Sequence, residues 1–316
     1  MKVTALRHER LFEPFLDPVD GVLCLPADAT AAEVARLAAP AGLRFPLWLD
    51  PAQPLRTNWA ASDHAPASSR FGPFCDNCTG MNWELPDGRV VRVGERVVKS
   101  TTGYDLLRFL LAAGPRFGRA QAVVLRLRPL CDREGAFFLQ GSDDALEKVA
   151  AQILQGPYLH WLESVDWLAP SAGRPQLRLG VHCPTAEWAA LAAYLGSLAG
   201  PQALDLGEKP GPETAADGIP DLAVKTTPDR VIPLCRELTR AGQLRCVGLC
   251  YPGVVHAYLP PGGDPAATID RLVSQHGADW ERDGGDWISR HASRAFGNEA
   301  ESRWVRDLTT AWKAAA

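Results

Sequence analysis

Short apolar segments and amphipathic segments alternate along the chain, with glycine and proline at many of their ends. In the first part, apolar side chains recur on one helical face over 31–42 and over 104–114, which predicts two helices. Apolar runs and alternation with a period of two predict strands. These strands are expected at 21–26, 43–50, 81–88, 89–94 and 120–130. The Pro-Asp-Gly sequence at 86–88 is typical of the turn of a β-hairpin.

The pattern starts anew after residues 129–135, which predicts a domain boundary there. Strand, helix, strand, strand and helix follow, in the order of a split β-α-β unit. These elements are expected at 136–141, 143–156, 160–170, 175–183 and 186–200. Further strands are expected at 221–227, 244–252, 254–260 and 278–283, with helices at 228–242, 265–277 and 302–316. The sequence shows no internal repeat.

Two segments have little periodicity. Residues 51–80 are rich in Pro, Ser, Ala and Asn and are expected to form one long loop. A loop of that length is uncommon inside a compact domain and is often functional. Residues 205–221 are polar and contain several Gly and Pro, so a second loop is expected there.

Composition limits the possible functions. The chain has 316 residues, 46% apolar and 22% charged, which fits about two soluble domains. The net charge of −4 is spread along the chain and argues against nucleic-acid binding, which usually needs a basic face. There is no apolar run of about 18 residues, so no membrane span is expected. The first 15 residues carry charges where a secretory signal has an apolar stretch, so a cytoplasmic location is expected.

The eight cysteines have irregular spacing, and reduced, mostly buried thiols are the default expectation. Cys75 and Cys78 form the one C-x-x-C pair. A structural zinc site usually needs four ligands, and no second pair or histidine has suitable spacing, so no metal site is predicted. A redox or zinc role for this pair remains a minor alternative. His182 and His256 fall in predicted strands, where a packed imidazole is a simpler interpretation than a general base.

Neither a G-x-G-x-x-G nor a G-x-x-x-x-G-K-[ST] motif follows a predicted strand, and no G-x-S-x-G sequence is present. The remaining candidate is the strand-to-helix segment that contains Lys99, Tyr104 and Asp105. Such a turn could hold a cofactor. Equally, Asp105 could simply interact with the dipole of the helix that begins there. The residue types alone leave both interpretations open.

Residues 21–130 together resemble a known pattern. The sequence VVKSTTGYDLLRFLL at 97–111 and the sequence LRLRP at 125–129 resemble the later part of the flavin-binding domain of FAD-linked oxidases of the vanillyl-alcohol oxidase or p-cresol methylhydroxylase (PCMH) type. Upstream, RFGPFCDNCTGM at 70–81 and residues 21–50 match further parts of that domain in order. The closest branch of the family is the FAD-binding subunit of glycolate oxidase.

The resemblance implies an α+β fold with two domains. Residues 1–130 would form a partial PCMH-type FAD-binding domain, its second subdomain, and residues 131–316 a ferredoxin-like antiparallel-sheet cap domain. The cofactor would be FAD. The matching positions near the flavin, carried over as remnants of the family's site, are Arg70, Asp76, Tyr104, Gly114 and Gly118. No catalytic residue can be assigned, because single positions of the cap domain do not align.

The chain departs from the family pattern at the groups that hold the phosphates. The family's Gly-rich pyrophosphate loop has no counterpart, since no glycine precedes Gly21, and the chain is expected to be truncated at its N-terminus. A family Gly pair is replaced within 57–60, and Pro115 removes a main-chain donor beside Gly114. Backbone N–H groups normally bind a pyrophosphate, so flavin binding is expected to be degenerate.

Two functions follow from the resemblance. In one, the chain is a non-catalytic or assembly subunit that pairs with a complete flavin subunit and an iron–sulfur subunit of an oxidase complex. In the other, it is an active FAD-dependent oxidoreductase subunit that oxidises a 2-hydroxy acid such as glycolate.

Overall fold

The computed structural model describes residues 11–47, 49–62, 70–95, 106–113, 117–168, 174–202, 204–210, 222–242, 244–258 and 279–282. The fold is α+β with antiparallel sheets, and the chain divides into two compact units. The first unit comprises 1–60, 74–130 and 285–316, and the second comprises 61–73 and 131–284. The expected helices at 265–277 and 302–316 lie outside the described residues.

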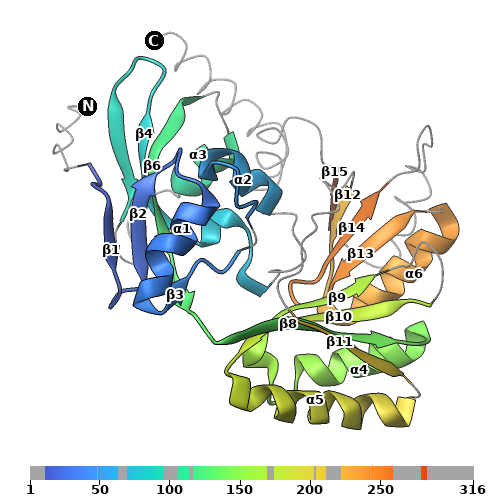
Figure 1. Cartoon of the computed structure of the whole chain (residues 1–316). Coiled ribbons are helices and arrows are strands. Elements are labelled where there is room, and N and C mark those ends of the chain that lie inside the picture. The colour runs from blue at the N-terminus through green and yellow to red at the C-terminus, as the bar shows by residue number, and fades with distance from the viewer. Residues whose placement is uncertain are drawn as a thin grey trace. The chain divides into compact units, whose positions relative to one another are not determined.

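The first unit contains a five-stranded antiparallel sheet with the order β1-β2-β6-β4-β5. Figure 1 shows these strands in blue to green. Their bounds are β1 Phe15–Asp17, β2 Val22–Pro26, β4 Cys78–Glu84, β5 Val90–Gly94 and β6 Arg119–Arg126. Two short strands, β3 (Leu43–Arg44) and β7 (Arg128–Pro129), pair separately. The helices are α1 Ala31–Ala38, α2 Leu55–Ser62 and α3 Leu106–Ala113, with 3-10 turns at Ala39–Ala41 and Phe74–Asp76.

The start of α1 is fixed by its own sequence. The Thr30 hydroxyl accepts a hydrogen bond from the Glu33 amide at 3.3 Å, and the Glu33 carboxylate accepts one from the Thr30 amide at 2.8 Å. This capping box satisfies donors that the first helical turn leaves without partners. Val34 and Ala38 then face the interior of the unit.

The long loop expected at 51–80 is wrong in part, because α2 lies within it. The sequence of α2 has little amphipathic character, and tertiary contacts hold the helix instead. Leu55 is fully buried, and the buried Asn58 side chain accepts a hydrogen bond from the Asp50 amide and donates to the carbonyls of Asp50 and Gln53. Such contacts override weak local propensity.

The second unit begins with the order β-α-β-β-α-β. Its elements are β8 Arg133–Gln140, α4 Asp143–Leu154, β9 Leu162–Leu168, β10 Gln176–Cys183, α5 Thr185–Ala199 and β11 Asp205–Pro210. In the sheet the strands lie as β11-β8-β10-β9. Strand β11 occupies the first part of the segment expected to be a loop at 205–221, so that expectation is wrong for 205–210.

The strands of the remaining described elements repeat the strand order of this half, a repeat that the sequence did not reveal. They are β12 Leu222–Lys225, α6 Val231–Gly242, β13 Arg245–Leu249, β14 Val254–Tyr258 and β15 Asp279–Arg282. Their strands lie as β13-β14-β12-β15, which is the order of the first half read from its other end. Strands β9 and β13 join the halves into one eight-stranded antiparallel sheet (Figure 1).

One face of this sheet forms the apolar core of the second unit. Helices α4, α5 and α6 contribute to this core, where Leu146, Leu191 and Leu238 pack with residues of β8, β9, β10, β12, β13 and β14. None of the helices that the structure describes is long and apolar enough to cross a membrane.

Gly248 lies where the two halves of the sheet meet, opposite Trp167. A Cβ atom at this position would lie 2.6 Å from Val231 Cγ1 and 2.9 Å from Cys235 Sγ, both on α6. Helix α6 therefore packs against bare backbone at this point.

We expect Gly248→Ala to lower the free energy of unfolding by about 1–3 kcal/mol, because the added methyl group overpacks a filled site. Gly207→Ala is the matched control, since a Cβ there meets nothing closer than 4.0 Å in the same sheet. Urea unfolding followed by circular dichroism measures both. Equal effects of the two substitutions would contradict the packing argument.

Candidate functional site

Three of the five positions that the resemblance places near a flavin are described by the structure. Arg70, Asp76 and Gly118 lie in described segments, whereas Tyr104 and Gly114 lie outside them. Each of the three contacts other parts of this chain. The contacts are considered in turn, because they determine whether these segments have room for a cofactor.

Gly118 begins the approach to β6 with φ of 122°, a conformation that residues with a side chain rarely adopt. A Cβ atom there would collide with the main-chain carbonyl oxygen of Glu84 and would lie 2.7 Å from Trp83 Nε1. The Trp83 indole is buried and donates a hydrogen bond to the Phe117 carbonyl at 2.8 Å. Gly118 is thus packed directly against the end of β4, and no ligand atom fits on that side of its backbone.

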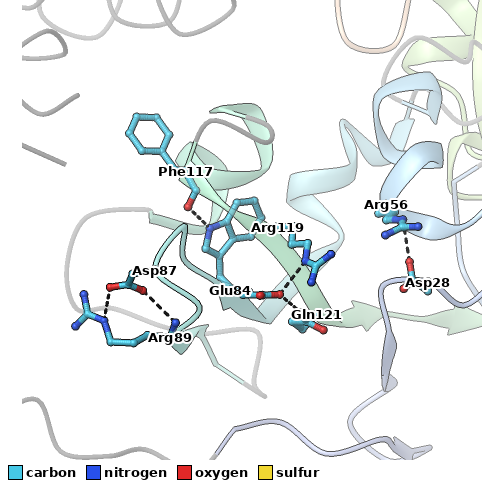
Figure 2. Close-up of polar contacts among 9 residues, drawn as sticks. Asp28, Arg56, Glu84, Asp87, Arg89, Phe117, Arg119 and Gln121 are labelled. Carbon is cyan, nitrogen blue, oxygen red and sulfur yellow. Dashed lines mark hydrogen bonds and ion pairs between the residues drawn. The ribbon is translucent and has the colours of Figure 1, made fainter. Parts of the chain in front are cut away.

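A polar network continues along these strands on the surface of the unit (Figure 2). The Glu84 carboxylate accepts hydrogen bonds from Arg119 Nε at 2.8 Å and from the Gln121 amide. The hydrogen bond from Arg119, and next that from Gln121, lower the pKa of Glu84. A separate pair joins Arg56 on α2 to Asp28 at 2.8 Å. The first set of contacts joins β4 to β6, and the Arg56–Asp28 pair joins α2 to the turn that follows β2.

Asp76 closes the 3-10 turn before β4, and its carboxylate lies 2.6 Å from Arg108 Nη2 on α3. The Cys75 thiol also contacts this carboxylate, at 3.7 Å. Asp76 therefore ties the turn to α3. Because Arg108 is another residue of the family pattern, the two matched positions interact with each other.

Arg70 belongs to the second unit. Its Nη1 atom lies 2.7 Å from the His160 carbonyl oxygen, 3.1 Å from that of Leu162 and 3.3 Å from that of Leu159. Its guanidinium also lies 5.8 Å from the ring centroids of Phe71 and Tyr251. Arg70 thus satisfies carbonyls at the end of the 3-10 turn Leu159–Trp161.

Of the cysteine pair, Cys78 is a buried core thiol and Cys75 is half-buried. Cys75 lies in a 3-10 turn and Cys78 begins β4. Burial raises the pKa of Cys78 to about 12, so this thiol resists the deprotonation that metal binding and redox chemistry require. Among the described residues, no group of three or more His, Cys, Asp or Glu could hold a metal ion.

The second unit buries a set of ionisable residues that the sequence analysis did not select. Arg178 Nη2 lies 2.8 Å from Asp166 Oδ2, and the two residues face each other across β10 and β9. Their side chains are 6% and 0% exposed. Both imidazoles expected to be packed in strands, His182 on β10 and His256 on β14, are also buried. The sequence signal that could have identified the pair was the presence of Asp166 and Arg178 within strands that are otherwise largely apolar.

Asp166 is completely buried, with the Arg178 guanidinium beside its carboxylate. The positive charge of the Arg178 guanidinium stabilises this carboxylate. The nearby Cys250 thiol has a raised pKa, chiefly because it is buried and also because of the negative charge of Asp166. A buried pair of this kind is costly to break, because the remaining charge loses its partner in a medium of low dielectric constant.

Comparisons with known proteins relate the chain to flavoenzymes. No protein-family model matches. An uncharacterized FAD-linked oxidoreductase of Mycobacterium tuberculosis is 25% identical over 117 residues, which are 35% of this chain and 25% of the relative. The mitochondrial D-lactate dehydrogenase (cytochrome) of Arabidopsis thaliana is 32% identical over 89 residues, which are 28% of this chain and 16% of that enzyme. The matches thus span a quarter or less of these relatives.

Among solved structures, an alkyldihydroxyacetonephosphate synthase superposes with a TM-score of 0.58 at 10% identity, over 91% of this chain and 63% of that one. A second structure of a synthase of that name gives a TM-score of 0.56. These similarities establish the fold. Together with the sequence matches they relate the chain to FAD-linked oxidoreductases.

Gly118→Ala tests the packing beside the expected flavin segment. We expect a loss of about 2–5 kcal/mol in the free energy of unfolding, since the backbone conformation and the Glu84 carbonyl both oppose a side chain. Gly88→Ala is the control, because Gly88 also has a positive φ, 83°, but open space around its Cβ position. Its loss should be about 1–2 kcal/mol. Urea titration distinguishes the two, and equal losses would show that Gly118 is not tightly packed.

Arg178→Met tests the buried ion pair. We expect it to cost about 3–5 kcal/mol, because the buried Asp166 carboxylate loses this cationic partner. The double variant Asp166→Asn/Arg178→Met should recover part of that loss. Thermal unfolding of the full chain measures both, and a double variant that is less stable than Arg178→Met would contradict the pairing.

Proposed function

We propose that this chain is a non-catalytic relative of the FAD-binding subunit of a glycolate oxidase-type complex, in which the flavin-facing segments serve to hold the fold together. One observation carries the proposal: the side of Gly118 on which a Cβ would lie, at a position expected to face the cofactor, is filled by the Glu84 carbonyl and the Trp83 indole. A pyrophosphate is held chiefly by main-chain N–H groups that approach it closely, often at glycine.

The other described positions support the same conclusion. Asn58 directly precedes the two positions, 59 and 60, at which the family has its Gly pair. Both polar atoms of the Asn58 side chain bind main-chain atoms of Asp50 and Gln53. Asp76 pairs with Arg108, and Arg70 binds carbonyls of the second unit. The described residues at these positions do not fit a pyrophosphate cradle, so no step of a flavin reaction is derived from them.

Such a subunit would act by association. Its expected partners are a complete flavin subunit and an iron–sulfur subunit of a cytoplasmic oxidase complex. The retained two-unit fold would then present a surface to those partners, while the flavin chemistry takes place elsewhere.

A second function is favoured by one observation. The second unit buries Asp166, Arg178, His182 and His256, and buried ionisable groups are common in active sites. If FAD binds, these residues make the chain a candidate for an active FAD-dependent oxidoreductase that oxidises a 2-hydroxy acid such as glycolate. FAD would then accept the two electrons released at the α-carbon of the substrate.

Flavin content decides between the two functions. We expect the purified full chain to be colourless, without absorbance at about 370 and 450 nm. Added FAD should leave the tryptophan fluorescence, corrected for absorption by FAD itself, unquenched up to about 100 μM, a concentration that would nearly saturate a site with a dissociation constant of about 1 μM. A complete D-lactate dehydrogenase, measured in parallel, is the positive control.

Stoichiometric FAD in the purified protein would overturn the first proposal. Glycolate-dependent bleaching of that flavin would then support the second, whereas a flavin that no 2-hydroxy acid reduces would oppose it. Affinity purification of the complex measures the association directly: under the first proposal, the colourless chain co-purifies with a flavin-containing subunit.

A further inference from the structure

The chain passes from the first unit into the longer segment of the second unit at Cys131, and the first residues of this segment bind the end of β10 and the start of α5. The Cys131 amide donates a hydrogen bond to His182 Nε2 at 3.3 Å. The Thr185 amide and hydroxyl donate to the two Asp132 carboxylate oxygens at 2.8 and 2.9 Å. Residue 184 at the N-cap of α5 is a proline without a side-chain cap bond, so Asp132 caps this helix from outside.

The hydrogen bond from Cys131 defines the state of the imidazole. Because a main-chain amide donates to Nε2, this nitrogen carries no proton, and the neutral ring holds its proton on Nδ1. Nδ1 lies 3.8 Å from Glu163 Oε1. The His182 side chain is only 4% exposed, so the imidazole has little freedom to turn away from these two neighbours.

Several charged groups surround His182. Glu134 lies directly opposite on β8, Glu163 faces it from β9, and the charge of Asp132 interacts with it from the connection. These three carboxylates stabilise an added positive charge on the ring. The cations nearby are engaged elsewhere: Arg133 with Glu208 and the Trp188 ring, and Arg178 with Asp166. Glu187, in the first turn of α5, adds a further negative charge.

We propose that His182 is a proton-controlled latch for the connection at residues 130–131, one of those by which the chain passes between the two units: the neutral ring holds the Cys131 amide, and protonation releases it. The imidazolium has a hydrogen on both nitrogens, so Nε2 becomes a donor and faces another donor. The two groups then repel one another, and the Cys131 amide is left to bind water.

The neighbouring Asp132 contact provides an internal reference. The hydrogen bonds from the Thr185 amide and hydroxyl lower the pKa of Asp132, and the charge of His182 lowers it further. A carboxylate with a lowered folded-state pKa stays ionised as pH falls through the usual histidine range and loses its contribution only at lower pH. Mild acid therefore releases Cys131 while Asp132 still caps α5.

NMR-detected hydrogen exchange of the full chain between pH 8 and pH 5 tests the latch. After correction for intrinsic exchange, protection of the Cys131 amide should fall about 3- to 10-fold with acidification, as expected for loss of one hydrogen bond. Protection of the Thr185 amide should stay constant. In His182→Gln the pH-dependent step at Cys131 should vanish, because glutamine does not titrate. His160→Gln, at an exposed histidine, should keep the step.

The proposal is overturned if protection at Cys131 does not change with pH, if it changes equally in His182→Gln, or if Thr185 loses protection in parallel. The nitrogen-15 chemical shifts of the His182 imidazole report which ring nitrogen carries the proton. This second measurement uses the wild-type chain, so it remains possible if the variant does not fold. At pH 8 the latch requires the proton on Nδ1. A neutral ring protonated on Nε2 would overturn it.

Discussion

The second unit depends on the pairing of β9 with β13, because this pairing is what joins the two similar halves into one sheet among the described strands. Gly248 makes that pairing compatible with the helix layer, since α6 approaches the sheet where Gly248 has no side chain. Trp167 stands opposite on β9, and the Asp166–Arg178 pair lies at the neighbouring positions of β9 and β10. The apolar core thus lies directly beside the most deeply buried charges of the unit, and a shift of register would displace both.

The first unit shows how a fold related to FAD-linked oxidoreductases can be held together by residues that the family pattern associates with a ligand. Asp76 meets Arg108, and Gly118 meets the end of β4. Contacts of this kind within the chain fill space and satisfy polar groups. These contacts supply stability of their own, which does not depend on a bound cofactor.

The sequence predicted most strands and helices, since periodicity and turn residues reflect local physics. The split β-α-β order after residue 135 was visible because each element buries one face. Helix α2 was missed, since Asn58 and Leu55 hold it through tertiary contacts that no local pattern reveals. Strand β11 was missed because its sequence is polar, as is common on a sheet edge. The role of the candidate site depends on which side chains of β4, β6 and α3 contact one another. The spacing of residues along the sequence does not predict those contacts.

The position of Arg70 affects how the polypeptide acquires its structure. In the sequence, Arg70 lies between strands of the first unit. Its guanidinium nevertheless donates hydrogen bonds to main-chain carbonyls of the second unit, about 90 residues further along the chain. Neither unit is one continuous stretch of chain, so a fragment that starts at residue 131 would lack a native cation beneath the 3-10 turn Leu159–Trp161. Contacts between residues so far apart in sequence form slowly. During synthesis on the ribosome, the second unit can therefore complete its fold only by binding residues 61–73, which emerged much earlier.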